Sequence, residues 1–165
     1  MNKKSSATSV QKEKRIEFEE PLPARTEAEG RGRVQLRPIG VIRSALKKRR
    51  EAPKQGSEGA PDAWLEVSPF ASDGIEGLVT GDEIIVVTWL HRSRRDVLKV
   101  HPRSDCRRPL TGVFATRSPD RPNPLGLHRV TLKRINKRRL RIGPIEVIDG
   151  TPVMDIKPVL SVQDF

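Results

Sequence analysis

The segment that most restricts the fold is Glu83–Leu90, EIIVVTWL, which is apolar on both faces and rich in β-branched residues. Such side chains favour extended backbone, so this segment is predicted to be a buried strand. Shorter apolar runs recur every 8 to 20 residues and are separated by glycine, proline and polar residues. These further predicted strands lie within Val34–Ser44, Trp64–Val67, Gly112–Thr116, His128–Ile135, Arg138–Ile142 and Val153–Leu160.

The segments between these runs predict turns and loops rather than helices. Lys47–Pro61 is a long loop without periodicity, and Pro69–Gly81 carries three glycines that indicate turns. Asn136-Lys137 is a plausible hairpin turn, and Asp149–Pro152 has the composition of a tight turn. A fold of alternating strands and helices needs amphipathic segments of 10 to 15 residues, which are missing here. We therefore predict an all-β protein, a single small closed or strongly bent β-barrel with long loops and few or no substantial helices.

The chain divides by composition into an extension and a barrel domain. Residues 1–33 alternate charge with Ser, Gly and Pro and hold few large apolar side chains, so they are predicted to be disordered or loosely attached. They contain 8 basic and 6 acidic residues, which leaves +9 of the net charge of +11 to residues 34–165. A cationic domain favours a polyanionic partner, nucleic acid before membrane, although basic surfaces also serve solubility.

Other features of the composition restrict the cellular compartment in which the protein is expected. No apolar run approaches the length of a membrane span, and the N-terminus lacks the apolar region of a signal peptide. Cys106 is the single cysteine, so an intrachain disulfide is excluded and a reducing compartment is expected. We assign Cys106 no role and predict a cytoplasmic protein.

The stretch Gly112–His128, GVFATRSPDRPNPLGLH, is the strongest candidate for a binding site. Pro119, Pro122 and Pro124 each fix a φ angle and remove a backbone donor, so the loop is rigid before any ligand binds. The apolar run before it is interpreted as a strand, and Gly126 is interpreted as the residue that closes the loop. A stiff loop that carries arginines, an aspartate and an asparagine suits the wall of a binding site better than a simple connection.

Polar clusters also occur near three other strand ends: Pro53–Gly56, His91-Arg92 and Asp149–Lys157. A closed barrel gathers strand ends from distant sequence positions at one rim, although polar residues lie at strand ends in every β protein. No metal site is predicted, because His91, His101 and His128 lack a ligand spacing and a cysteine pair. The chain also lacks a G-x-S-x-G nucleophile elbow and the common phosphate-binding loops.

Four segments resemble the TrmO family, also called TsaA-like. They are RPIGVIRS (37–44), WLHR (89–92), GVFATRSPDRPNPLGLHRV (112–130) and VIDGTPVMDIKP (147–158), and the resemblance covers about Leu36–Leu160. It implies a β-barrel methyltransferase that uses S-adenosylmethionine to methylate the exocyclic amino nitrogen of threonylcarbamoyl-adenosine beside the tRNA anticodon. It also implies a homodimer with the cofactor near the subunit interface. Longer members carry a C-terminal domain, so this chain resembles a short form.

The resemblance carries cofactor contacts onto positions in all four polar clusters. These are Gln55, Gly56, His91, Arg92, Arg117, Leu127, His128, Asp149, Gly150, Thr151 and Pro152. On chemical grounds Arg117 or Arg92 suits the methionine carboxylate, because a guanidinium pairs bidentately with it. Asp149 suits the ribose hydroxyls.

Candidates for the acceptor side are Asn123, Asp155 and Lys157, the first being in the proline loop. Asp155 is a candidate for accepting the proton that the exocyclic nitrogen must lose, with the alternative that it only braces Arg117 or Lys157. The sequence leaves open two other functions: methyl transfer to another RNA or a small molecule, and a cofactor-sensing or RNA-binding module without turnover.

Overall fold

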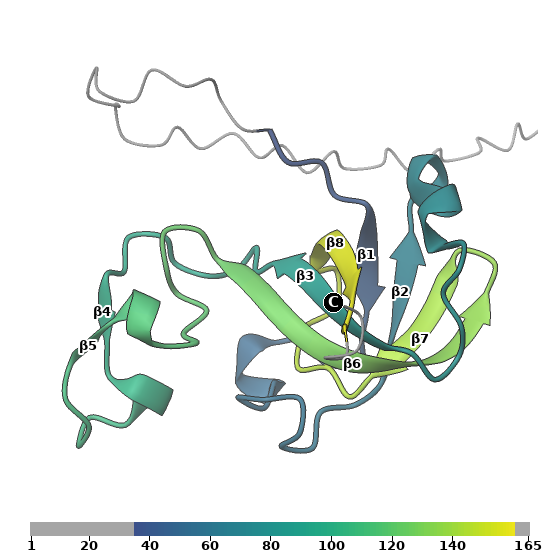
Figure 1. Ribbon diagram of the computed structural model, residues 1–165. Helices are drawn as coiled ribbons and strands as arrows, with labels where there is room; N and C mark the ends of the chain where they lie inside the picture. Colours follow the sequence, from purple (N-terminus) through teal and green to yellow (C-terminus); the bar gives the residue numbers. More distant parts are fainter. Residues whose placement is uncertain (1–34, 161–165) are drawn as a thin grey trace, which may run out of the picture. The chain divides into compact units, whose positions relative to one another are not determined.

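The computed structural model describes residues 35–160 and shows a closed antiparallel barrel of six strands in the order β1-β2-β7-β6-β3-β8 (Figure 1). The barrel strands are β1 (Gly40–Arg43), β2 (Ala63–Val67), β3 (Glu83–Trp89), β6 (Leu125–Asn136), β7 (Arg139–Gly143) and β8 (Pro152–Pro158). β4 (Lys99–Val100) and β5 (Thr111–Gly112) form a separate two-stranded sheet in the connection between β3 and β6. The predicted all-β barrel is confirmed, whereas the predicted extension 1–33 lies outside the described residues.

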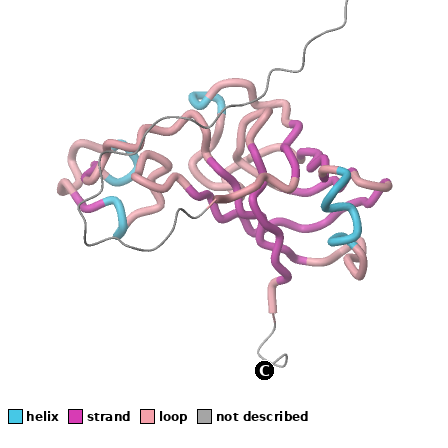
Figure 2. Tube along the Cα trace, turned by 90° about the horizontal axis from the view of Figure 1, so that it is seen from above, coloured by secondary structure: helices cyan, strands magenta, loops and turns pink. Residues whose placement is uncertain are grey.

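The helices of the described chain are short 3-10 segments in the connections, the longest of seven residues (Figure 2). They are η1 (Arg49–Glu51), η2 (Pro69–Ile75), η3 (Pro102–Ser104) and η4 (Val113–Ala115). This agrees with the predicted scarcity of helix. Within residues 35–160, no helix combines the length and the apolar character that crossing a membrane requires.

Strand alternation creates the core. In β3 the side chains of Ile84, Val86 and Thr88 are fully buried, and their neighbours in sequence lie on the outer wall. β2 and β7 alternate in the same way, because successive strand residues face opposite sides of a sheet. Ile145 and Val147 follow β7 without forming a strand, yet both are buried and belong to the core cluster.

The antiparallel pairing gives the barrel two different ends. Because each strand runs against both neighbours, β1, β3 and β7 finish at the end where β2, β6 and β8 begin. Three long connections therefore lie at this end, which we call the loop end: residues 44–62, 90–124 and 144–151. The opposite end, the hairpin end, carries the β6–β7 turn and residues 68–82.

The prediction that residues 113–115 form part of a strand is wrong. These residues form the 3-10 turn η4, in which the Thr116 hydroxyl donates to the Val113 carbonyl at 2.9 Å. The Arg121 guanidinium donates to the same carbonyl at 3.0 Å, so no strand partner pairs with it. Only Val113 of the run is buried, and Phe114 is 80% exposed.

Two turn predictions also shift. Gly126 does not close the proline loop but lies inside β6, opposite Thr88 of β3. The β6–β7 turn is Lys137-Arg138 rather than Asn136-Lys137, because Asn136 pairs with Arg139, and Lys137 takes the positive φ of 52°.

Candidate functional site

The loop end is held together by polar contacts between connections that are far apart in sequence. The Asp149 carboxylate accepts a hydrogen bond from the Ser44 backbone N–H at 3.0 Å and pairs with Lys47 Nζ at 3.1 Å. The backbone N–H of Asp149 donates to the Leu46 carbonyl at 2.7 Å. Burial opposes ionisation of Asp149, but these contacts outweigh it and hold the pKa of its carboxyl below the usual value. Asp149 therefore joins 144–151 to 44–62.

Arg121 fixes the shape of the proline loop. Its guanidinium donates to three carbonyl oxygens, those of Ser118 at 2.8 Å, Val113 at 3.0 Å and Thr116 at 2.6 Å. Its backbone N–H also donates to the Arg94 carbonyl at 3.0 Å. With these contacts Arg121 holds the loop, so it is a structural residue of the site.

Asp120 connects the proline loop to two other segments. Its Oδ1 accepts from Arg49 Nη2 at 2.9 Å and from the Arg94 backbone N–H at 2.9 Å. Arg49 Nη1 also donates to the Arg92 carbonyl at 3.2 Å. The connections 44–62 and 90–124 are thus joined beside the predicted cofactor residue Arg92.

A buried polar chain runs from β3 through β6 into the β7–β8 connection. His128 Nδ1 lies 2.8 Å from Glu146 Oε1, and its Nε2 lies 2.9 Å from the Thr88 hydroxyl. An ionised carboxylate can only accept, so Nδ1 carries a hydrogen and donates to Glu146, while Nε2 forms a hydrogen bond with the Thr88 hydroxyl. Burial disfavours the charge on Glu146, but the hydrogen bond and the attraction of His128 lower its pKa below the usual value.

Two glycines let the backbone approach this chain. A Cβ at Gly126 would lie 2.4 Å from His128 Nε2 and 2.6 Å from Thr88 Oγ1. A Cβ at Gly56 would lie 2.9 Å from the Pro144 carbonyl and 3.1 Å from Glu146 Oε2. Gly56, a predicted cofactor residue, therefore lies directly against the buried chain.

The end of β3 presents buried nitrogen atoms without partners. Among the described residues, Trp89 Nε1 and His91 Nδ1 are the buried side-chain nitrogen or oxygen atoms that make no hydrogen bond. Burial, and secondarily the positive charge of Arg92, lower the pKa of His91, so its ring is neutral at pH 7. Buried polar groups are normally paired, so two such atoms within three residues at the end of β3 suit a ligand with hydrogen-bonding groups.

The other predicted cofactor residues differ in what they contact. Gln55, Arg92 and Arg117 are exposed, and no partner for the Arg117 guanidinium is found among residues 35–160. Leu127 is 55% exposed on the outer wall opposite Val87, whereas its neighbour His128 faces the interior.

The predicted turn at Asp149–Pro152 is confirmed as a turn that enters β8. Gly150 has a φ of 77°, and its N–H donates to the Ile42 carbonyl at 2.8 Å. The Thr151 hydroxyl donates to the Ile148 carbonyl at 2.7 Å and is buried with Pro152. These groups fix the turn beside β1.

The acceptor-side candidates are not gathered at one place. Asn123 is exposed in the proline loop, two residues before β6. Asp155 lies on β8 opposite Val87 and pairs with Lys157 Nζ at 2.9 Å. This is one of the two partners that the sequence left open for Asp155. Lys157 lies two residues further from the loop end.

Sequence reasoning missed Glu146 and Thr88. Glu146 carried a signal, since it is a single carboxylate within the apolar run Ile145–Ile148. Thr88 carried none, because a threonine inside a predicted strand is ordinary.

The fold and the site define a closed six-stranded barrel whose three long connections form a polar site at one end. The model of the tRNA-methyltransferase O N-terminal domain matches residues 41–165. The chain therefore belongs to this family, as the resemblance predicted.

Two curated relatives and one solved structure illustrate the family. A probable S-adenosyl-L-methionine-binding protein of Archaeoglobus fulgidus is 45% identical over 131 residues, which are 79% of this chain and 35% of the relative. A second protein of that organism, named an S-adenosyl-L-methionine-binding protein, is 40% identical over 124 residues, 74% of this chain and 86% of the relative. The crystal structure of TrmO from Pseudomonas aeruginosa is similar with a TM-score of 0.64 and 31% identity, over 81% of this chain and 59% of that one. This chain thus spans about a third of the first relative and less than two thirds of the TrmO structure.

Proposed function

We propose that this protein is an S-adenosylmethionine-dependent methyltransferase acting on the exocyclic amino nitrogen of threonylcarbamoyl-adenosine beside the anticodon of tRNA. The observation that carries the proposal is the pair of unpartnered buried nitrogens of Trp89 and His91 at the loop end. They lie in the same end of the barrel as the cofactor positions that the family resemblance indicates. Family membership and the names of the relatives support this choice of ligand.

The residues present fit such a cofactor. Bound S-adenosylmethionine supplies an electrophilic methyl group on a sulfonium. The exposed Arg117 guanidinium, without a partner in residues 35–160, binds the carboxylate of the ligand as a two-pronged donor. The indole N–H of Trp89 donates to a ligand oxygen or nitrogen, and His91 pairs through Nδ1. The spare lone pairs of Asp149 accept from ribose hydroxyls.

Positioning is the main contribution of the remaining residues. Glu146 orients His128, and the close approach of Gly56 keeps the 44–62 connection against this pair. Arg121 and Asp120 hold the proline loop in one shape before the ligand binds, which lowers the entropy cost of binding. Methyl transfer needs in-line approach, so a preformed rim supplies rate by orientation.

The acceptor side of the proposal rests on Asn123, Asp155 and Lys157. Asn123 belongs to the proline loop and offers both a donor and an acceptor to the base. Asp155, 48% exposed, receives the proton of the exocyclic nitrogen directly or through water, with Lys157 holding its carboxylate.

A homodimer completes the proposed site. Leu125 and Leu127 are 40% and 55% exposed on β6 and face outward beside Trp89 and Val87 of β3. Adjacent exposed apolar side chains indicate an interaction surface. If a second copy covers this wall, Leu127 becomes a buried contact for a cofactor bound near the interface. Light scattering should then give a dimer mass, and Leu127→Asp should shift it toward the monomer; a monomer mass for the unsubstituted protein would overturn the dimer.

The direct test is transfer of labelled methyl from S-adenosylmethionine to tRNA that carries or lacks the threonylcarbamoyl group. The proposal expects label only on the modified tRNA, at the modified adenosine. Cofactor binding with transfer to another RNA or a small molecule would change the substrate. Cofactor binding without transfer to any substrate would indicate a sensing module.

A further inference from the structure

The β6–β7 hairpin carries a concentrated positive charge that runs from its turn to Asp62 beside the loop end. Residues 131–143 contain six cations and no carboxylate, and all six side chains are exposed. We call these six residues the hairpin surface: Lys133, Arg134, Lys137, Arg138, Arg139 and Arg141.

Nearby carboxylates neutralise the hairpin surface only in part. Asp62 pairs with Lys133 Nζ at 2.6 Å and with Arg141 Nη2 at 3.3 Å, and Glu66 pairs with Arg139 Nε at 3.4 Å. The other three cations have no ion-pair partner within residues 35–160. Six cations and two carboxylates leave a net charge of +4 on this wall. Exposed pairs are weak, so an incoming polyanion can exchange with them.

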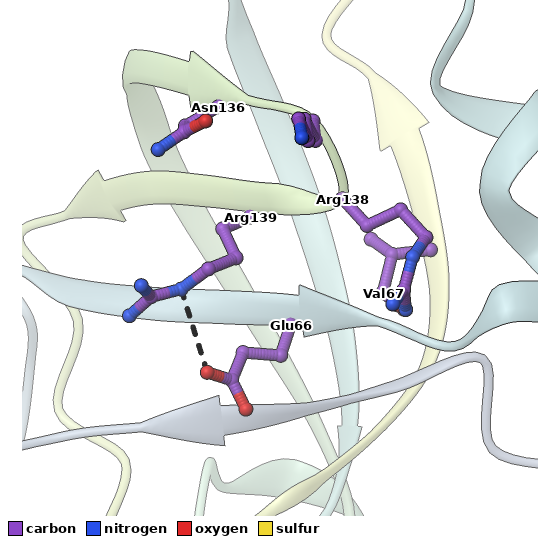
Figure 3. A pocket seen from close by; sticks show the side chains of 6 residues that line it. Glu66, Val67, Asn136, Arg138 and Arg139 are labelled. Atoms are coloured by element: carbon purple, nitrogen blue, oxygen red, sulfur yellow. Dashed lines mark hydrogen bonds and ion pairs between the residues drawn. The ribbon is translucent and has the colours of Figure 1, made fainter.

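The turn of the hairpin holds part of this charge in a fixed place. Arg138 Nη1 donates to the Val67 carbonyl at 2.7 Å, and the Val67 N–H donates to the Arg138 carbonyl at 2.8 Å. A hollow of about 540 Å³ lies against the turn (Figure 3). It is lined by Glu66, Val67, Asn136, Lys137, Arg138 and Arg139. A concave, cationic and preformed surface suits phosphate groups.

An aromatic ring within the same wall distinguishes between polyanions. The Arg139 guanidinium lies over the Trp64 ring, 4.8 Å from its centroid. RNA bases stack on aromatic rings and on arginine planes, while the phosphates pair with the surrounding cations. An anionic membrane offers charge but no planar group to stack, so the combination favours RNA.

We propose that the hairpin surface binds the phosphate backbone of a folded RNA. This inference rests on the proposed function, because the RNA is taken to be the substrate of the methyl transfer. β6 runs from Leu125 at the loop end to Asn136 at the hairpin turn, a path of about 36 Å along its backbone at the usual strand rise. A small ligand at the loop end cannot reach both ends, whereas a folded RNA can. Contacts at the hairpin surface anchor the substrate irrespective of its sequence, because phosphates carry no sequence information.

The test measures RNA binding without the cofactor. A fluorescein-labelled RNA stem-loop is titrated by fluorescence anisotropy at several salt concentrations from about 50 to about 200 mM. The variant Arg134→Gln/Lys137→Asn removes two cations that have no carboxylate partner in residues 35–160, and asparagine tolerates the left-handed backbone at 137. The control Lys99→Asn/Arg107→Gln makes the same charge change in the 90–124 connection. Circular dichroism melts confirm that both are folded.

The hairpin variant should bind RNA on the order of tenfold more weakly, and the slope of log affinity against log salt should fall by roughly two. The control should change both by less than half as much. Equal losses in the two variants, or wild-type binding to anionic vesicles but not to RNA, would overturn the proposal.

The outcomes separate this inference from the proposed function. Unchanged RNA affinity in the hairpin variant, with methyl transfer intact, overturns the inference alone. If the hairpin variant loses RNA affinity as expected but the wild-type protein does not bind S-adenosylmethionine, the proposed function is overturned and the inference about the hairpin surface remains.

Discussion

The two ends of the barrel are made by the same six strands and differ in how the strands are joined. At the loop end, connections from three parts of the sequence are fixed to one another by Asp120, Arg121, Asp149 and the Glu146–His128 pair. At the hairpin end, a two-residue turn presents cations whose positions follow from the strand ladder. The loop end is thus organised for a small ligand that needs several groups in fixed geometry. The hairpin end is organised for a partner recognised by charge.

The largest expected effect concerns ligand binding at the loop end. Arg117→Ala should weaken S-adenosylmethionine binding by about 1.5–3 kcal/mol, because it removes a charge-assisted contact. Isothermal titration calorimetry measures this, with Arg107→Ala as the control, since Arg107 is an exposed arginine paired with Asp105. Equal cofactor affinity in Arg117→Ala and the wild type would remove Arg117 from the site.

The next effect concerns the buried polar chain. Gly126→Ala places a Cβ against His128 and Thr88 and should lower the free energy of unfolding by about 1–3 kcal/mol through overpacking and loss of their hydrogen bond. Gly112→Ala is the matched control, since a Cβ there meets nothing within 4 Å, and should change stability by less than about 0.5 kcal/mol. Urea unfolding gives both values, and similar stability of the two variants would contradict the packing.

A smaller effect depends on pH. The pKa of Glu146 is lowered in the folded protein, so its contribution is present above the pKa of an unfolded glutamate, about 4.3, and is lost as the pH falls through the folded pKa. Glu146→Gln should cost about 1–2 kcal/mol at pH 7, and this difference should shrink below about pH 4.3. Thermal melts across this range test it; a difference that stays constant with pH would show that the charge of Glu146 does not matter.

The smallest effect is expected on the outer wall. Asp155 and Lys157 are both exposed and paired, so Lys157→Met should change stability by less than about 1 kcal/mol. If Asp155 accepts the proton during transfer, Asp155→Asn should lower kcat and leave cofactor affinity unchanged. Full transfer activity in Asp155→Asn would leave its pairing with Lys157 as its only role.

Local pattern predicted the strands better than the site. Glu83–Leu90 was correct within one residue because its β-branched residues leave few alternatives to a strand. Gly126 was misread because a glycine next to a proline loop has the same sequence signature as one inside a strand. What decides its place is the space taken by Thr88 and His128, and that contact joins residues 40 positions apart.

The sequence predicted that the candidate site lies where strand ends meet at one end of the barrel, but it did not predict the contacts within the site. Asp120 and Arg121 were recognisable as polar residues of a stiff loop, but nothing local showed that they bind Arg49 and backbone carbonyls. Glu146 was missed because its partner His128 is 18 residues away on β6, whereas Glu146 lies in the β7–β8 connection. Such pairings are set by tertiary structure, which sequence periodicity does not encode.

The two tryptophans allow one measurement to test directly whether the cofactor binds at the loop end. Trp89 lies at the loop end with its indole N–H unpartnered among residues 35–160, and Trp64 lies beside the hairpin surface under Arg139. In ¹H–¹⁵N spectra of the labelled protein titrated with S-adenosylmethionine, the Trp89 indole signal should move and the Trp64 indole signal should stay in place. Movement of the Trp64 signal with an unchanged Trp89 signal would contradict a cofactor site at the loop end.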